Sequence, residues 1–127
     1  MKYLRRHSQD TKITRAEALA YTPVKSAQTE ETRLDSGEIM LIYTVTIRPW
    51  FTGLMKRFGG TSDGRFQKKL QLDLLGSEVW DLLDGQRSVR EVIRQFARRH
   101  QLHPREAEVA ITRFIRDLGK RGLVGLR

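Results

Sequence analysis

Apolar positions from residue 88 onward recur every three or four residues, which is the spacing of an amphipathic helix. The stripe consists of Val89, Val92, Ile93 and Phe96. Ser88 and Glu91 have the spacing of a capping box, in which the serine oxygen accepts a hydrogen bond from the glutamate amide. The pattern therefore predicts a helix that begins after Ser88 and ends near His100.

A second amphipathic helix is expected from Pro104 to Lys120. Proline suits the first helical position, where its missing amide has no partner within the helix. The apolar stripe consists of Ala107, Ala110, Ile111, Phe114, Ile115 and Leu118. Gly122 is the expected end of this helix, and the apolar run from Leu123 to Leu126 is expected to form a strand.

The preceding segments predict one more helix and a sheet. Leu75 to Leu83 reads as a helix with Asp73 as its cap, and Arg65 to Leu72 reads as a strand whose apolar face is interrupted by a lysine. Glu38 to Arg48 is rich in β-branched and aromatic residues, and a turn joins it to an expected strand at Ser26 to Leu34. The sequence predicts an α+β fold, with an N-terminal three-stranded antiparallel sheet followed by three helices.

The predicted organisation is a flexible N terminus at residues 1–13 and a single domain at residues 14–127. A short capped helical turn is expected at Thr14 to Glu17. Residues 49–64 form an apolar and basic insertion. Trp50 to Phe58 could rest on a membrane, but we favour a hairpin excursion that folds back on the domain, because large exposed apolar patches are uncommon.

The chain has 127 residues, no cysteine and a formal charge of +9. The missing cysteines exclude disulfides and thiolate chemistry, and they fit a reducing compartment. The basic N-terminal residues are not followed by an apolar run, so neither a signal peptide nor a spanning helix is expected, and the predicted location is the cytoplasm. The basic excess favours an acidic partner.

No arrangement of residues predicts an enzyme. His100 and His103 stand on either side of a helix end with no carboxylate pair nearby, so they read as cap and linker residues rather than metal ligands. Residues 59–64 are glycine-rich but lack the ending of a phosphate-binding loop. We therefore predict no catalytic residue, no metal and no cofactor.

The run from Leu72 to Gly85, with Trp80 near its middle, is followed by the capped segment Ser88 to Ile93 and by the closing helix and Gly122 to Val124. Taken together, the order and spacing of these segments resemble the pyrroloquinoline quinone biosynthesis protein D family, PqqD, over the chain from about Phe66 onward. The resemblance implies a winged helix-turn-helix-like fold. It also implies a non-catalytic peptide chaperone, a recognition element that binds the leader of a ribosomally made precursor and presents it to a modifying enzyme, such as a radical SAM enzyme.

The resemblance also implies where a peptide binds. Strand addition would take place along the strand Arg65 to Leu72, which is flanked by the closing helix. The candidate peptide-binding residues are Gln67, Lys68, Lys69, Leu70, Gln71, Thr112, Arg113 and Arg116. The peptide, the enzyme and the pathway stay open, and an open sheet edge allows a monomer or a dimer.

The alternative function is a winged-helix transcriptional regulator that binds DNA. Arg90, Arg94 and Arg98 form a like-charge stripe on the second helix, which costs helix stability and invites a functional explanation. The third helix, however, carries Glu106, Glu108 and Asp117 among its arginines, and these would face phosphates unfavourably. We therefore place nucleic acid second to a peptide.

Overall fold

The computed structural model describes residues 13–46 and 65–127. Residues 1–12 of the predicted flexible N terminus, and the whole predicted insertion at 49–64 with its Trp50 to Phe58 segment, lie outside this part of the chain. Two compact units are present, one made of residues up to Val24 with Leu82–Arg127, and one made of Lys25–Asp81. The single domain stays a prediction. No helix within the described ranges is long and apolar enough to cross a membrane.

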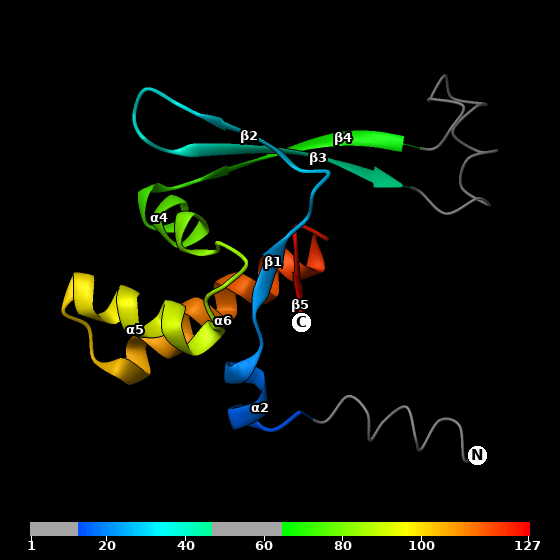
Figure 1. Ribbon diagram of the computed structural model, residues 1–127. Coiled ribbons are helices and arrows are strands. Elements are labelled where there is room, and N and C mark those ends of the chain that lie inside the picture. Colours follow the sequence, from blue (N-terminus) through cyan, green and yellow to red (C-terminus); the bar gives the residue numbers. More distant parts are fainter. Residues whose placement is uncertain (1–12, 47–64) are drawn as a thin grey trace, which may run out of the picture. The chain divides into compact units, whose positions relative to one another are not determined.

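A three-stranded antiparallel sheet lies in the unit Lys25–Asp81 (Figure 1). Its strands β2 (Glu30–Arg33), β3 (Ile39–Thr46) and β4 (Arg65–Leu72) have the order β2-β3-β4, so β3 is central and the other two are edges. The predicted sheet is confirmed. The first strand begins at Glu30 instead of Ser26, because residues 26–29 form a turn in which the Thr29 amide donates to the Ser26 carbonyl.

The two faces of the sheet differ in burial. Ile39, Leu41 and Tyr43 of β3 are buried, and they stand opposite Leu72, Leu70 and Lys68 of β4. Residues that stand opposite each other on antiparallel strands share a face, so this face is the apolar one. Lys68 interrupts it, as the alternation in the sequence predicted.

The helix α4 (Leu74–Leu82) follows β4 directly. Asp73 caps it as predicted, because its Oδ1 accepts a hydrogen bond of 2.7 Å from the Gly76 amide. Ser77 is buried, and its hydroxyl accepts from the Ile39 amide at 2.9 Å. The Trp80 side chain is fully buried and donates through Nε1 to Glu31 Oε2 at 2.8 Å. The bonds of Ser77 and Trp80 join α4 to the sheet.

The helices α5 (Val89–His100) and α6 (Pro104–Lys120) pack against each other in the other unit. The predicted capping box is present, with the Ser88 side chain bonded to the Glu91 amide and the Glu91 side chain to the Ser88 amide. Both apolar stripes are mostly buried. The core of this unit consists of Leu19, Leu82, Leu83, Val89, Val92, Ile93, Phe96, Ala107, Ile111, Ile115, Leu118, Leu123 and Val124.

Two features of this unit go beyond the predicted elements. The capped turn at Thr14 extends into the helix α2 (Arg15–Ala20). The strand β5 (Val124–Leu126) pairs with a short strand β1 (Pro23–Lys25), and the backbones of Thr22 and Arg127 exchange hydrogen bonds of 2.9 and 3.0 Å. The sequence predicted the C-terminal strand but not its partner, because the two strands lie at opposite ends of the chain.

Candidate functional site

The strand β4 is an open edge within the described part of the sheet. It pairs with β3 along all eight residues, and no described strand pairs with its other side. An edge strand leaves every second amide and carbonyl without a partner in the sheet. Five of the residues predicted to bind a peptide, Gln67 to Gln71, form the middle of this edge.

The side chains along β4 divide between the two faces. Leu70 is half-buried on the apolar face with Lys68 next to it, whereas Gln67, Lys69 and Gln71 are exposed on the opposite face. Among the described residues neither lysine forms an ion pair. The edge therefore offers backbone hydrogen-bonding groups next to positive charge that is not already neutralised.

The other edge of the sheet, β2, is shorter and its side chains are already engaged. Arg33 donates to both carboxylate oxygens of Asp81 at 2.9 Å, and Glu31 accepts from Trp80. β2 has four residues and begins with Glu30 and Glu31, so its charge would repel an acidic strand. The longer and basic β4 is therefore the better edge for the addition of an acidic strand.

The three predicted residues of α6 do not form one surface. Thr112 is half-buried, and Arg113 and Arg116 are exposed. Thr112 and Arg116 line the same apolar pocket, whereas Arg113 lines a separate shallow hollow of about 420 Å³ with Arg105 and Val109. Residues 112, 115, 116 and 119 share a helix face at the spacing i, i+3, i+4 and i+7, and Arg113 lies on the next face.

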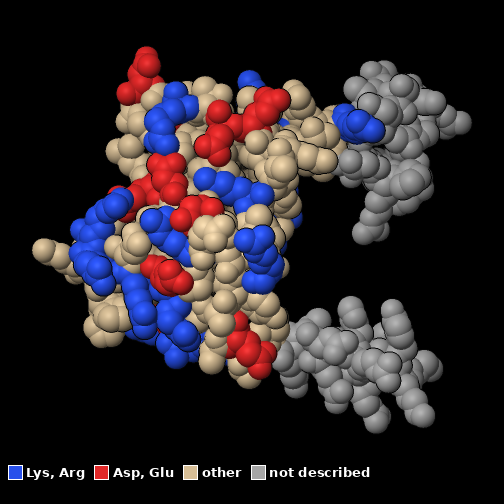
Figure 2. Space-filling model, in the orientation of Figure 1, with Lys and Arg blue, Asp and Glu red and all other residues tan. Residues whose placement is uncertain are grey.

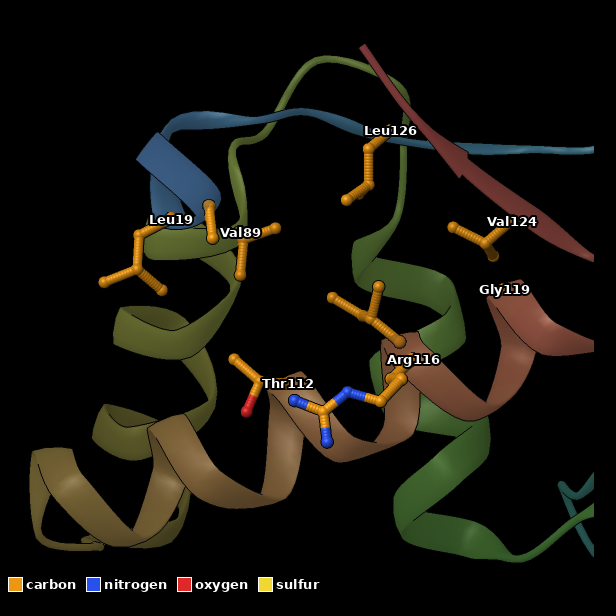
Figure 3. Close-up of a pocket in the computed structure, with 9 residues that line it drawn as sticks. Leu19, Val89, Thr112, Arg116, Gly119, Val124 and Leu126 are labelled. Atoms are coloured by element: carbon orange, nitrogen blue, oxygen red, sulfur yellow. The ribbon is translucent and has the colours of Figure 1, made fainter. Parts of the chain in front are cut away.

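The apolar pocket has a volume of about 270 Å³ and belongs entirely to the unit that contains α6. Figure 3 shows its lining side chains, which come from α2, from the start of α5, from one face of α6 and from β5. The lining residues are Ala18, Leu19, Val89, Thr112, Ile115, Arg116, Gly119, Val124 and Leu126. Sequence reasoning missed the walls from α2 and β5, because these elements are far from each other in the sequence and no local pattern places them together.

Polar contacts hold the pocket walls in place. Arg15 of α2 donates through Nε to Glu108 Oε2 at 2.8 Å and through its second nitrogen to Glu108 Oε1. The Val89 amide donates to the Tyr21 carbonyl at 2.8 Å, which joins the end of α2 to the start of α5. The hydrogen bonds from Arg15 hold the pKa of the Glu108 carboxyl below its usual range, although desolvation opposes this shift.

The described residues contain no group of three metal-ligating side chains. His103 caps α6, where its Nδ1 accepts from the Arg105 amide at 3.1 Å, and the His100 ring packs on Phe96 at the end of α5. His103 therefore has the predicted cap position, whereas His100 is the last residue of α5 and Gln101 is the cap of that helix.

Comparison with known families identifies the segment that carries β4, α4, α5 and α6. Residues 63–124 match the model of the family described as "Coenzyme PQQ synthesis protein D (PqqD)". The segment is PqqD-like, and the resemblance stated from the sequence is confirmed over these residues. The match includes the β4 edge and α6 but excludes α2, β2 and β3.

A solved structure has a similar fold. It is described as "TbiB1 in Complex with the TbiA(beta) Leader Peptide", and it is similar with a TM-score of 0.55 and 19% sequence identity. The similarity covers 80% of this chain and 93% of that chain. It confirms the predicted α+β architecture. No match was found among curated proteins.

Proposed function

We propose that this chain is a non-catalytic peptide-binding protein that captures the leader of a ribosomally made precursor peptide. The observation that carries the proposal is the open edge of β4, eight residues long, with its two uncompensated lysines. Its place in a PqqD-like segment supports the proposal, as does a similar fold that was solved with a leader peptide bound.

Binding takes place by strand addition. The backbone of Gln67 to Gln71 pairs with an extended leader, which supplies affinity without reading the peptide sequence. Successive side chains of the leader then point to opposite faces of the sheet. Those on one face meet Leu70 and those on the other meet polar side chains, so an alternating leader is preferred.

Positive charge makes the binding selective for leaders with acidic residues. Lys68 and Lys69 on the edge, with Arg113 and Arg116 on α6, attract acidic residues of the leader. Exposed charges of this kind raise the association rate more than they lower the dissociation rate, and salt screens them. Thr112 contributes less, because its hydroxyl already donates to the Glu108 carbonyl at 2.7 Å.

The bound leader is presented to a modifying enzyme, for which the family resemblance suggests a radical SAM enzyme. The captured peptide and the enzyme are then the two partners, and the chain itself contributes no catalytic group. Both partners would meet this protein in the cytoplasm.

DNA binding is the competing function, and the basic surface of α5 is the observation that favours it. Figure 2 shows Lys and Arg side chains gathered over the region of α5. Arg90, Arg94 and Arg98 are exposed there and form no ion pair within the described residues. On α6, however, Glu106 and Asp117 are exposed among the arginines and would repel phosphates.

The deciding experiment is an amide NMR titration of the labelled protein with leader peptides from short reading frames beside its gene. We expect shifts concentrated on β4 and α6. Methylation of a backbone amide of the peptide should weaken binding at every second position only, because only every second amide of an added strand donates to the edge. This control leaves the protein unchanged.

Two kinds of variant separate the rival functions. Lys68→Pro and Lys69→Pro remove neighbouring amides, which point to opposite sides of β4. One proline therefore disturbs the pairing with β3, and the other disturbs only the open edge. We expect the proline variant that disturbs only the open edge to lose peptide binding and keep its fold. Reversal of charge at Arg90 and Arg94 should leave peptide binding intact. Shifts on α5 with duplex DNA, and none with any peptide, would favour the regulator instead.

A further inference from the structure

The apolar pocket beside α2 has one charged group at its mouth. Leu19, Val89, Ile115 and Val124 are buried in its walls, whereas Leu126 is 50% exposed. Arg116 is the charged residue of the lining, and its exposed side chain lies along α6 toward Thr112 (Figure 3). A pocket with apolar walls and one cation suits a ligand with an apolar part beside an anionic group.

The charge of Arg116 is available to such a ligand. It forms no ion pair within the described residues, and no carboxylate lines the pocket. Glu108 lies two turns before Arg116 on α6, and its carboxylate is already held by Arg15 and by Arg105 at 3.0 Å. Asp117 follows Arg116 directly, so it points about 100° away around the helix.

The size of the pocket restricts what can enter. Its volume of about 270 Å³ lies just below the range of roughly 300–1,000 Å³ that is usual for small-molecule sites. One or two aliphatic side chains would fill it. Gly119 has no side chain and so leaves space in one wall of the pocket. A Cβ there would lie 3.6 Å from the Val124 carbonyl oxygen, and a longer side chain would occupy the pocket.

We propose that this pocket binds one aliphatic side chain of the leader peptide and that Arg116 pairs with the carboxylate of a neighbouring Asp or Glu of the same peptide. This inference rests on the proposed function. The pocket would select leaders that carry an aliphatic residue next to an acidic one. The wall from α2 lies outside residues 63–124, which match the family model.

The test measures the affinity of a fluorescein-labelled leader peptide, encoded beside the gene, by fluorescence anisotropy. Gly119→Leu fills the pocket and Arg116→Glu reverses its charge. The matched controls are Gly125→Leu, at a glycine with nothing within 4 Å of an added Cβ, and Lys120→Glu on the same helix. We expect the pocket variants to weaken binding at least about tenfold and the controls to change it less than about twofold.

The peptide is changed in parallel, with Ala in place of the aliphatic residue and Gln or Asn in place of the acidic one. Each replacement should weaken binding to the parent protein and have little further effect on the matching pocket variant, which is the signature of a direct contact. NMR signals of the Val124 and Leu126 methyl groups should shift on binding. If Gly119→Leu unfolds, Arg116→Glu and the peptide replacements decide the question.

The outcomes separate this inference from the function on which it rests. If pocket variants and controls bind alike while the β4 proline variant loses binding, the pocket has no role and the strand-addition function stands. If no leader binds the parent protein, both fail. If octanoate shifts the pocket methyl signals and no peptide does, the pocket takes a fatty acid and the inference is wrong.

Discussion

Arg15 of α2 and Glu108 of α6, which stand 93 positions apart in the sequence, are joined by a two-pronged ion pair. The same carboxylate also accepts from Arg105, so Glu108 serves two arginines at once. This arrangement fixes the α2 wall of the pocket to the helix that forms its opposite wall. The carboxylate of Glu108 is therefore one of the anchors of the α2 wall, beside the hydrogen bond between the Val89 amide and the Tyr21 carbonyl.

Glu108→Gln should loosen α2 without unfolding the unit. The substitution removes the charge that pairs with Arg15, and α2 has few other anchors. Hydrogen exchange of the Ala18 and Leu19 amides should become faster, while exchange in the middle of α5 stays unchanged. Glu106→Gln, at an exposed carboxylate on the same helix, is the control and should leave α2 as it was.

The same contact should respond to acid. Because the pKa of Glu108 is lowered in the folded protein, the stabilisation is fully present above the ordinary glutamate pKa of about 4.3 and is lost as the pH falls through the lowered value. The Leu19 methyl signal should follow this titration in the parent protein. In Glu108→Gln it should not, and a titration that persists there would assign the effect to another group.

Ser77→Ala should destabilise the sheet unit by about 1–3 kcal/mol. The buried hydroxyl accepts from the Ile39 amide and donates to the Leu72 carbonyl at 3.3 Å, so alanine leaves a buried amide without a partner. Urea unfolding measures the loss. Ser36→Ala, at an exposed turn residue, should cost less than about 0.5 kcal/mol, and equal losses at both serines would contradict the assignment.

Trp80→Phe should lower the free energy of unfolding by about 1–3 kcal/mol. The fully buried indole loses its hydrogen bond to Glu31 and leaves a cavity, and the Lys25 ammonium, 4.6 Å from the ring centre, loses its best aromatic partner. Glu31→Gln keeps an acceptor for the indole and should cost less. The order of the two losses in urea unfolding tests whether the ring or the carboxylate matters more.

Ser88→Ala should destabilise α5 by about 1 kcal/mol, because the amide of Glu91 loses its capping oxygen. Ser88→Thr retains that oxygen and should cost only a few tenths of a kcal/mol. Thermal unfolding of the two variants compares them directly. A larger loss for threonine than for alanine would show that the tight space around residue 88, and not the cap, controls stability.

Local signals in the sequence predicted the elements well. The capping residues Ser88 and Asp73, the proline at 104 and the alternation in β4 each act within a few positions, so their effect can be read directly. The pairing of β1 with β5 could not be predicted in this way. Its two strands have three residues each and come from opposite ends of the chain, so neither has a local sequence pattern that identifies its pairing partner.

The residues of the candidate site differ in the same way, because those on β4 could be predicted from the local pattern and the shared face of α6 could not. Gln67 to Gln71 follow from the strand pattern, and all five lie on an edge that no other strand of the described residues covers. The residues predicted on α6 shared one helix but not one face, because the resemblance named the helix and not its rotation. Arg113 consequently lies apart from Thr112 and Arg116.

The lysines of β4 also bear on whether this protein associates with itself. Two copies that met edge to edge along β4 would bring Lys68 and Lys69 of one close to those of the other, and like charges on neighbouring strands repel. That repulsion weakens when salt shortens the reach of charge to a few ångströms. At ordinary ionic strength, the same two side chains therefore favour a foreign acidic strand over a second copy of their own.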